Sequence, residues 1–220
     1  MTVRIRAVVF DFDGLILDTE LPIFRAWCRV FEAHGTIPPT IAEWSAGIGT
    51  TEGLDMESWL RERVGGPIDF AVINESRRMH RDELLAVERA LPGVVDWLDE
   101  AEAAGYGVAI ASSSPDDWVY EHLDRLGLVA RFSAIVTAGG ELRSKPAPDT
   151  YLEACARLAV EPRHALALED SPNGIAAAKA AGLRCVTVPH PLTETLDLSA
   201  ADLRVQSLAH CTLADALSRL

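Results

Sequence analysis

The chain has 220 residues, of which 49% are hydrophobic, so it can bury a sizeable core and is not expected to be disordered. Its 33 acidic residues against 20 lysines and arginines leave a net charge of −13, which disfavours nucleic-acid or membrane binding as a main role. The four cysteines are far apart and no apolar stretch is long enough to cross a bilayer. We therefore expect a cytoplasmic protein with reduced thiols, as a monomer or a small homo-oligomer.

The first predicted strand spans residues 3–11, with the sequence VRIRAVVFD. It is short, rich in β-branched residues and ends on Asp11. A helix is expected over residues 21–34, ended by Gly35 and a following pair of prolines. The residues that follow are rich in charged side chains and have a helical pattern, and no clear strand appears among them. We therefore predict an all-helical segment over residues 20–89.

From residue 91 onward, predicted helices and strands alternate. The helices are expected at residues 91–105, 114–127, 148–160 and 173–182, and the strands at 106–112, 132–138, 165–170 and 184–189. This alternation predicts a parallel sheet with helices on both faces. The expected fold is α/β, with a Rossmann-like doubly wound core over residues 1–15 and 91–220 and an inserted helical cap domain over 20–89.

Polar residues begin where three of these predicted strands stop. A parallel strand is buried on both faces and reads as an apolar run. Ligands bind at the carboxyl ends of such strands. The polar side chains at these ends are Asp11, Asp13, Ser112, Ser113, Glu169 and Asp170. We interpret them as the rim of an active site.

The carboxylates of this rim require a cation. Asp11 and Asp13 are two residues apart on a strand, which separates them by only about 6.6 Å along the chain. Carboxylates so close repel each other unless a cation lies between or beside them, and Glu169 and Asp170 add further negative charge. Mg²⁺ suits a site built from a few carboxylates and the oxygens of a phosphate. The sequence therefore predicts a magnesium site.

Two features predict phosphate binding at the same rim. Ser112 precedes a helix whose free N–H groups would hold an anion, and Ser114 is predicted to cap that helix, with Pro115 as its first residue. Lys145 lies in the segment SKPAP, where two prolines stiffen the loop. On so acidic a protein, we interpret this lysine as a phosphate clamp.

Four motifs of the chain resemble those of the haloacid dehalogenase-like hydrolases. DFDGLILDTE at residues 11–20 resembles the first motif, and ASS at 111–113 resembles the second. SKPAPD around Lys145 and LEDSPNG from Leu168 resemble the third and the fourth. The motifs follow the family's order, and the resemblance covers nearly the whole chain, including a helical cap after the first motif. The most similar branch is the phosphatase and β-phosphoglucomutase-like group.

The resemblance implies a role for each residue of the rim. Asp11 would be the nucleophile that forms an aspartyl-phosphate, and Asp13 the general acid and base. The implied phosphate-binding residues are Ser112, Ser113 and Lys145. The implied Mg²⁺ ligands are Asp11, Asp13 through its backbone carbonyl, Glu169 directly or through water, and Asp170.

The resemblance favours a phosphatase acting on a small phosphomonoester, such as a sugar phosphate. In β-phosphoglucomutase-like sequences a cap histidine is expected where this chain has Ile23, and a cap arginine where it has Thr50. Both departures weigh against the alternative of a sugar phosphomutase. Dehalogenases lack a carboxylate at the position of Asp13, which disfavours that activity. A non-catalytic phospho-receiver is the alternative from another class, because receivers also use acids, a hydroxyl and a lysine.

Two features of the predicted cap have no assigned role. Glu20 is expected at the mouth of the site, near the substrate or a hinge. A basic cluster lies on a predicted cap helix and comprises Arg77, Arg78, His80 and Arg81. We interpret this cluster as a solvated charged face, with a substrate-steering patch as the alternative.

Overall fold

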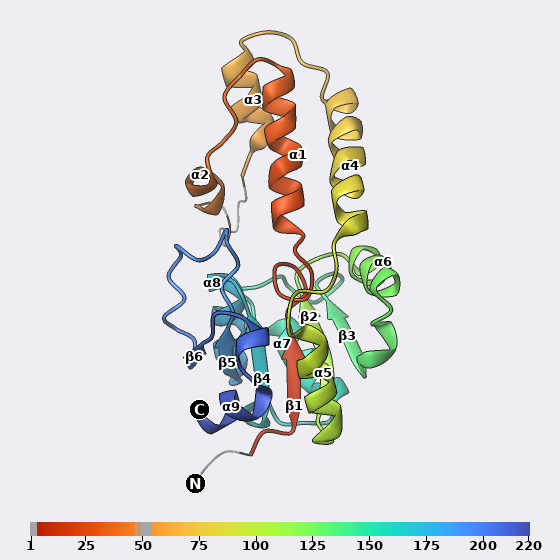
Figure 1. Cartoon of the computed structure of the whole chain (residues 1–220), viewed down its shortest axis with the longest axis vertical. Coiled ribbons are helices and arrows are strands. Elements are labelled where there is room, and N and C mark those ends of the chain that lie inside the picture. Colours follow the sequence, from red (N-terminus) through yellow and green to blue (C-terminus); the bar gives the residue numbers. More distant parts are fainter. Residues whose placement is uncertain (1–3, 47, 49–53) are drawn as a thin grey trace. The chain divides into compact units, whose positions relative to one another are not determined.

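A computed structural model describes residues 4–46, 48 and 54–220. The chain divides into two compact units. The larger unit comprises Met1–Leu17 and Arg89–Leu220, and the smaller unit comprises Asp18–Glu88 (Figure 1). None of the helices within the described ranges is both long enough and apolar enough to cross a membrane.

The larger unit is built on a six-stranded sheet in the order β3-β2-β1-β4-β5-β6, in which every neighbouring pair is parallel. The strands are β1 (Ala7–Phe10), β2 (Gly107–Ser112), β3 (Ala134–Thr137), β4 (Ala165–Glu169), β5 (Arg184–Thr187) and β6 (Leu203–Arg204). The predicted α/β fold with a parallel sheet is thus confirmed. The sequence did not predict β6, because two residues of mixed polarity carry no strand pattern.

The register of the sheet places three strand ends side by side. Phe10 at the end of β1 lies opposite Ile110 of β2 and Leu168 of β4. The backbone N–H of Asp11 continues this ladder by donating to the carbonyl of Leu168 over 2.9 Å. The residues that follow β1, β2 and β4 therefore meet at one edge of the sheet.

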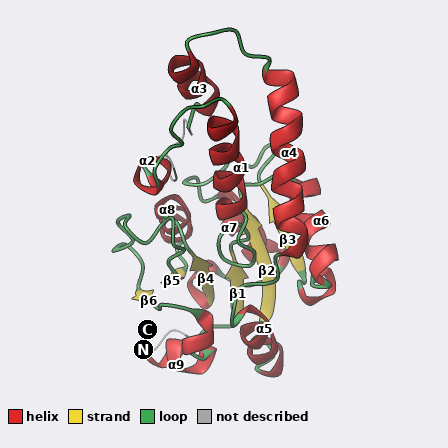
Figure 2. Cartoon of the chain, turned by 45° about the horizontal axis from the view of Figure 1, so that its top comes forward, coloured by secondary structure: helices red, strands yellow, loops and turns green. Residues whose placement is uncertain are grey.

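Helices cover both faces of this sheet (Figure 2). They are α5 (Val94–Ala103), α6 (Asp116–Leu126), α7 (Asp149–Arg157), α8 (Pro172–Ala181) and α9 (Leu213–Ser218). Ala7 and Val9 of β1 share a buried cluster with Tyr151 of α7 and Ile175 of α8. Strand side chains alternate between faces, so Val8 and Phe10 point to the other face. All four residues of β1 are fully buried, which explains its uninterrupted apolar sequence.

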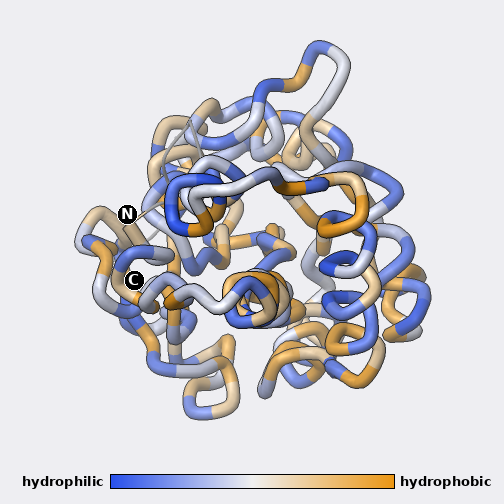
Figure 3. The backbone as a smooth tube through the Cα atoms, turned by 90° about the horizontal axis from the view of Figure 1, so that it is seen from above, coloured by the Kyte–Doolittle hydropathy of each residue, from blue (hydrophilic) through white to orange (hydrophobic). Residues whose placement is uncertain are grey.

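The smaller unit consists of helices, and no strand lies among its described residues. The helices are α1 (Glu20–Ala33), α2 (Ile41–Ser45), α3 (Met56–Val64) and α4 (Phe70–Val87). Side chains cap the starts of three of them, as Thr40, Asp55 and Asp69 accept hydrogen bonds from backbone N–H groups of α2, α3 and α4. Hydrophobic and hydrophilic residues are interspersed along the chain (Figure 3), as amphipathic packing requires.

Candidate active site

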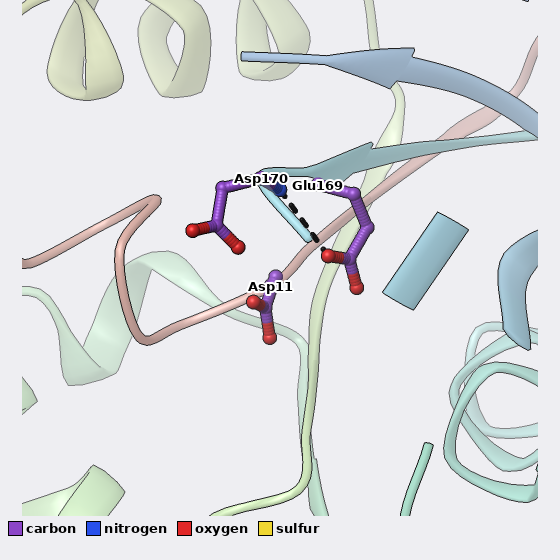
Figure 4. A group of neighbouring side chains, drawn as sticks. All are labelled: Asp11, Glu169 and Asp170. Carbon is purple, nitrogen blue, oxygen red and sulfur yellow. Dashed lines mark hydrogen bonds between the residues drawn. The ribbon is translucent and has the colours of Figure 1, made fainter. Parts of the chain in front are cut away.

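Three carboxylates gather at the ends of β1 and β4. They belong to Asp11, Glu169 and Asp170, and each contributes an oxygen within 4.8 Å of the others (Figure 4). We call these three residues the carboxylate group. Glu169 is fully buried, and Asp11 and Asp170 are 7% and 3% exposed. Like charges this close in a buried place are costly unless cations compensate them.

Lys145 supplies one compensating charge. Its Nζ lies 2.5 Å from Oδ1 of Asp11 and 2.6 Å from Oε1 of Glu169. Burial disfavours the charged ammonium, but the two carboxylates outweigh burial and raise the pKa of Lys145. Burial and the charge of Glu169 raise the pKa of Asp11 to about 7, although Lys145 opposes that rise. One ammonium therefore stabilises this group of acids only in part.

Both carboxylate oxygens of Glu169 accept hydrogen bonds. Tyr151 donates its hydroxyl to Oε1 over 2.7 Å, and burial, with the charges of Glu169 and Asp11, raises the pKa of that hydroxyl, so it stays a donor. Oε2 accepts from the hydroxyl of Ser171 over 3.3 Å and from the backbone N–H of Asp170 over 3.2 Å. Tyr151 was not predicted as a partner, because it lies on α7, away from the strand end that carries the acids. Ser171 directly follows Asp170 within the fourth motif, but the sequence analysis gave it no role.

Two glycines give the carboxylate group its space. A Cβ on Gly174, in the first turn of α8, would lie 1.9 Å from the carboxylate of Glu169. A Cβ on Gly14 would lie 2.4 Å from Oδ2 of Asp170, and Gly14 also has φ +77°. Any larger residue at these positions would displace a carboxylate.

The end of β2 connects the phosphate-binding residues predicted from the sequence. Ser112 is fully buried, and its hydroxyl accepts a hydrogen bond from the backbone N–H of Ser114 over 3.0 Å. The hydroxyl of Ser113 accepts from the backbone N–H of Lys145 over 3.0 Å. This contact ties the Lys145 loop to the strand end and explains how a lysine from a distant loop reaches Asp11.

The carboxylate of Asp13 is hydrogen-bonded to Trp118 of α6 and to Ser114 in the turn before it. Its Oδ2 accepts a hydrogen bond from the hydroxyl of Ser114 over 2.6 Å, and its Oδ1 accepts from Nε1 of Trp118 over 2.9 Å. The prediction that Ser114 caps the helix is wrong. The N-cap of α6 is Pro115, and the Ser114 hydroxyl bonds Asp13 instead. Trp118 was also missed, although its place in the first turn of a helix at the active edge was a usable signal.

The basic cluster lies on α4 in the smaller unit. Arg77 stacks over the ring of Trp27 at 4.8 Å, and burial, with the nearby Arg81 and Arg78, lowers its pKa. Arg78 is exposed. Nδ1 of His80 accepts a hydrogen bond from Arg29 over 2.9 Å. A cavity of about 390 Å³ lies beside this pair. The cluster is thus partly packed and partly solvated.

Three further positions of the predicted cap bear on the sequence-based predictions. Glu20 is the first residue of α1, and Ile23 lies in the first turn of the same helix. Thr50, which stands where a mutase-like sequence is expected to carry an arginine, lies outside the described residues.

Comparisons with known proteins identify the family of the chain. The family model described as haloacid dehalogenase-like hydrolase matches residues 8–188. The chain is 40% identical to YhcW of Bacillus subtilis over 98% of each chain, and 32% identical to hexitol phosphatase B of Escherichia coli over 97% of each. It also resembles the crystal structure of CbbY from Rhodobacter sphaeroides in complex with phosphate, with a TM-score of 0.76 and 31% identity over 96% of this chain and 98% of that one.

The chain therefore belongs to the haloacid dehalogenase-like hydrolases. The branch predicted from the four motifs, that of phosphatases and β-phosphoglucomutase-like proteins, is confirmed as well.

Proposed function

We propose that this protein is a Mg²⁺-dependent phosphatase that hydrolyses a small phosphomonoester through an aspartyl-phosphate on Asp11. It is a phosphoric monoester hydrolase. The observation that carries the proposal is the buried carboxylate group with Lys145 bridging Asp11 and Glu169. The hexitol phosphatase among the similar proteins supports a sugar phosphate or a related metabolite as the substrate, and the phosphate complex of CbbY supports binding of a phosphoryl group.

The residues present fit a divalent cation. Three buried carboxylates face one ammonium group, so the site retains negative charge that a second cation would neutralise. Asp11, Asp170 and the backbone carbonyl of Asp13 would hold Mg²⁺, and Glu169 would add its charge directly or through water. When bound, Mg²⁺ would neutralise charge on the oxygens of the phosphoryl group.

The chain's own residues account for both halves of the reaction. A carboxylate oxygen of Asp11 attacks phosphorus, forming an acyl-phosphate bond as the ester P–O bond breaks, and Asp13 gives its proton to the departing alcohol. Asp13 then accepts a proton from a water molecule, which attacks phosphorus and breaks the bond to Asp11. Inorganic phosphate leaves, and both aspartates return to their starting states.

The remaining residues bind and orient the substrate. The Ser112 hydroxyl, the Ser113 amide and the Lys145 ammonium would hold the oxygens of the phosphoryl group while charge develops on them. We also propose that residues 20–89 act as a cap that excludes bulk water, on a core of residues 1–15 and 91–220. The four cysteines, which are all described, are free, in keeping with a reducing, cytoplasmic location.

Turnover experiments test this proposal directly. The full chain is incubated with p-nitrophenyl phosphate and with a panel of hexitol, sugar and nucleoside phosphates, and released phosphate is measured. We expect many turnovers per chain with Mg²⁺, loss with excess EDTA and recovery when Mg²⁺ is restored. A phospho-receiver would accept at most one phosphoryl group per chain, and a mutase would isomerise its substrate with little phosphate release. Either result would overturn the proposal.

Metal binding has a readout that does not depend on activity. Mg²⁺ should raise the unfolding temperature of the EDTA-treated chain, because a ligand that binds only the folded state stabilises it. Asp170→Asn should remove most of this rise. Asp197→Asn, a matched change at an exposed acid outside the site, should retain it. An equal rise in both variants would exclude Asp170 as a ligand.

A further inference from the structure

We infer that Trp118 and Ser114 are positioning residues that fix the carboxylate of Asp13 in the orientation that proton transfer to the leaving group requires. This inference rests on the proposed role of Asp13 as general acid. Its evidence is the pair of hydrogen bonds from α6 and the preceding turn, one to each carboxylate oxygen.

The two donors differ in what they allow. An indole N–H can only donate, so Oδ1 of Asp13, which Trp118 contacts at 2.9 Å, remains an acceptor. A serine hydroxyl can donate or accept, so Ser114 at 2.6 Å can stay bonded to Oδ2 in either protonation state. The two hydrogen bonds together fix the orientation of the carboxylate of Asp13.

Aromatic packing holds the Trp118 ring in place for this task. Its ring meets the ring of His122 edge-on, with centroids 4.4 Å apart. His122 in turn stacks with Phe12 at 6.5 Å, and Phe12 is fully buried between the two aspartates in sequence. The indole N–H is thus aimed by groups anchored on the same loop as Asp13. A general acid needs such fixed orientation because proton transfer requires hydrogen-bond geometry with the leaving oxygen.

Substrates with different leaving groups separate positioning from general structural damage. p-Nitrophenolate is a stable anion that departs with little proton donation, whereas a sugar alkoxide depends on the acid. The measured quantity is kcat/KM, because it reports the steps up to departure of the leaving group and excludes hydrolysis of the aspartyl-phosphate. The substrates are p-nitrophenyl phosphate and the best sugar phosphate from the panel.

Trp118→Phe keeps a ring in the stack and removes the N–H. We expect kcat/KM for the sugar phosphate to fall about 10-fold or more, and that for p-nitrophenyl phosphate to stay within about 3-fold. Ser114→Ala should likewise lower kcat/KM for the sugar phosphate more than kcat/KM for p-nitrophenyl phosphate. Tyr120→Phe is a matched control on the same helix, since Tyr120 is 41% exposed, and should change neither value.

Equal losses for the two substrates in both variants, or no loss in either, would overturn the inference. If Trp118→Phe fails to fold by circular dichroism, Ser114→Ala decides the question alone. Failure of the proposed function looks different, because the unaltered chain would then turn over neither substrate.

Discussion

The carboxylate group at the sheet edge and the basic cluster on α4 both crowd like charges, yet the molecule accommodates them differently. The acids are buried and bound by Lys145 and by neighbouring donors. In the cluster, Arg77 lies on an aromatic ring and Arg78 is exposed. Water screens exposed charges at little cost, whereas burying charge is expensive. Burial of like charges therefore marks the functional region more reliably than crowding does.

The largest expected effect comes from removing the proposed nucleophile. Asp11→Asn should lower turnover by about 10³-fold or more, because the amide cannot form the aspartyl-phosphate. Turnover with Mg²⁺ and circular dichroism measure activity and fold, with Asp197→Asn as the control that keeps both. Substantial residual turnover in a folded Asp11→Asn chain would refute Asp11 as the nucleophile.

The pH dependence of the free energy of unfolding should reveal how unfavourable it is to ionise Asp11 among the other buried acids. The pKa of Asp11 is about 7 in the folded, metal-free chain, well above its ordinary value near 4. The folded state therefore binds this proton more tightly, and the stability that results is complete below about pH 4 and lost as pH rises through about 7.

Urea unfolding in EDTA between pH 4 and pH 8 measures this loss. We expect Asp11 to contribute a decline on the order of 4 kcal/mol, and Asp11→Asn to make the curve flatter. A curve as steep in Asp11→Asn as in the unaltered chain would show that other groups cause the decline.

A single methyl group tests how tightly the site is packed. Gly174→Ala should destabilise the chain by about 1–3 kcal/mol and reduce turnover, because the added Cβ would overlap the carboxylate of Glu169. Gly66→Ala is the matched control, since nothing lies within 4 Å of a Cβ there, and should change stability by less than about 0.5 kcal/mol. Thermal unfolding measures the stability of both variants. Equal stability would contradict the tight packing of Gly174 against Glu169.

The smallest effect is expected in the basic cluster. Arg78→Gln should change the free energy of unfolding by less than about 0.5 kcal/mol, because the side chain is exposed and solvated. It should also leave kcat/KM within about twofold. A fall in kcat/KM that disappears at high salt would instead favour the substrate-steering alternative.

The strand ends and their acids could be predicted from the sequence for a local reason. A strand buried on both faces must be apolar, so Asp11 and Glu169 are visible as the points where such strands stop. Because these strands alternate with helices, they are expected to be parallel, and their carboxyl ends then lie at one edge of the sheet. The parallel sheet and its register agree with that prediction.

The partners of those acids could not be predicted in this way. The contacts of Tyr151 with Glu169 and of Trp118 with Asp13 join residues 18 and 105 positions apart. Ser114 fits a helix cap equally well on local grounds, and only the position of Asp13 beside it decides otherwise. Hydrogen-bond partners across elements depend on how helices pack against the sheet, and local patterns do not specify that packing.

The sequence by itself therefore determined the family, the sheet and the acids at its edge, because buried strands and ordered motifs leave local marks. Only the tertiary structure decided which carboxylates share a space and which one turns to α6. The physical reason is that burial and donor geometry arise when distant segments pack, and they decide where charge can be held.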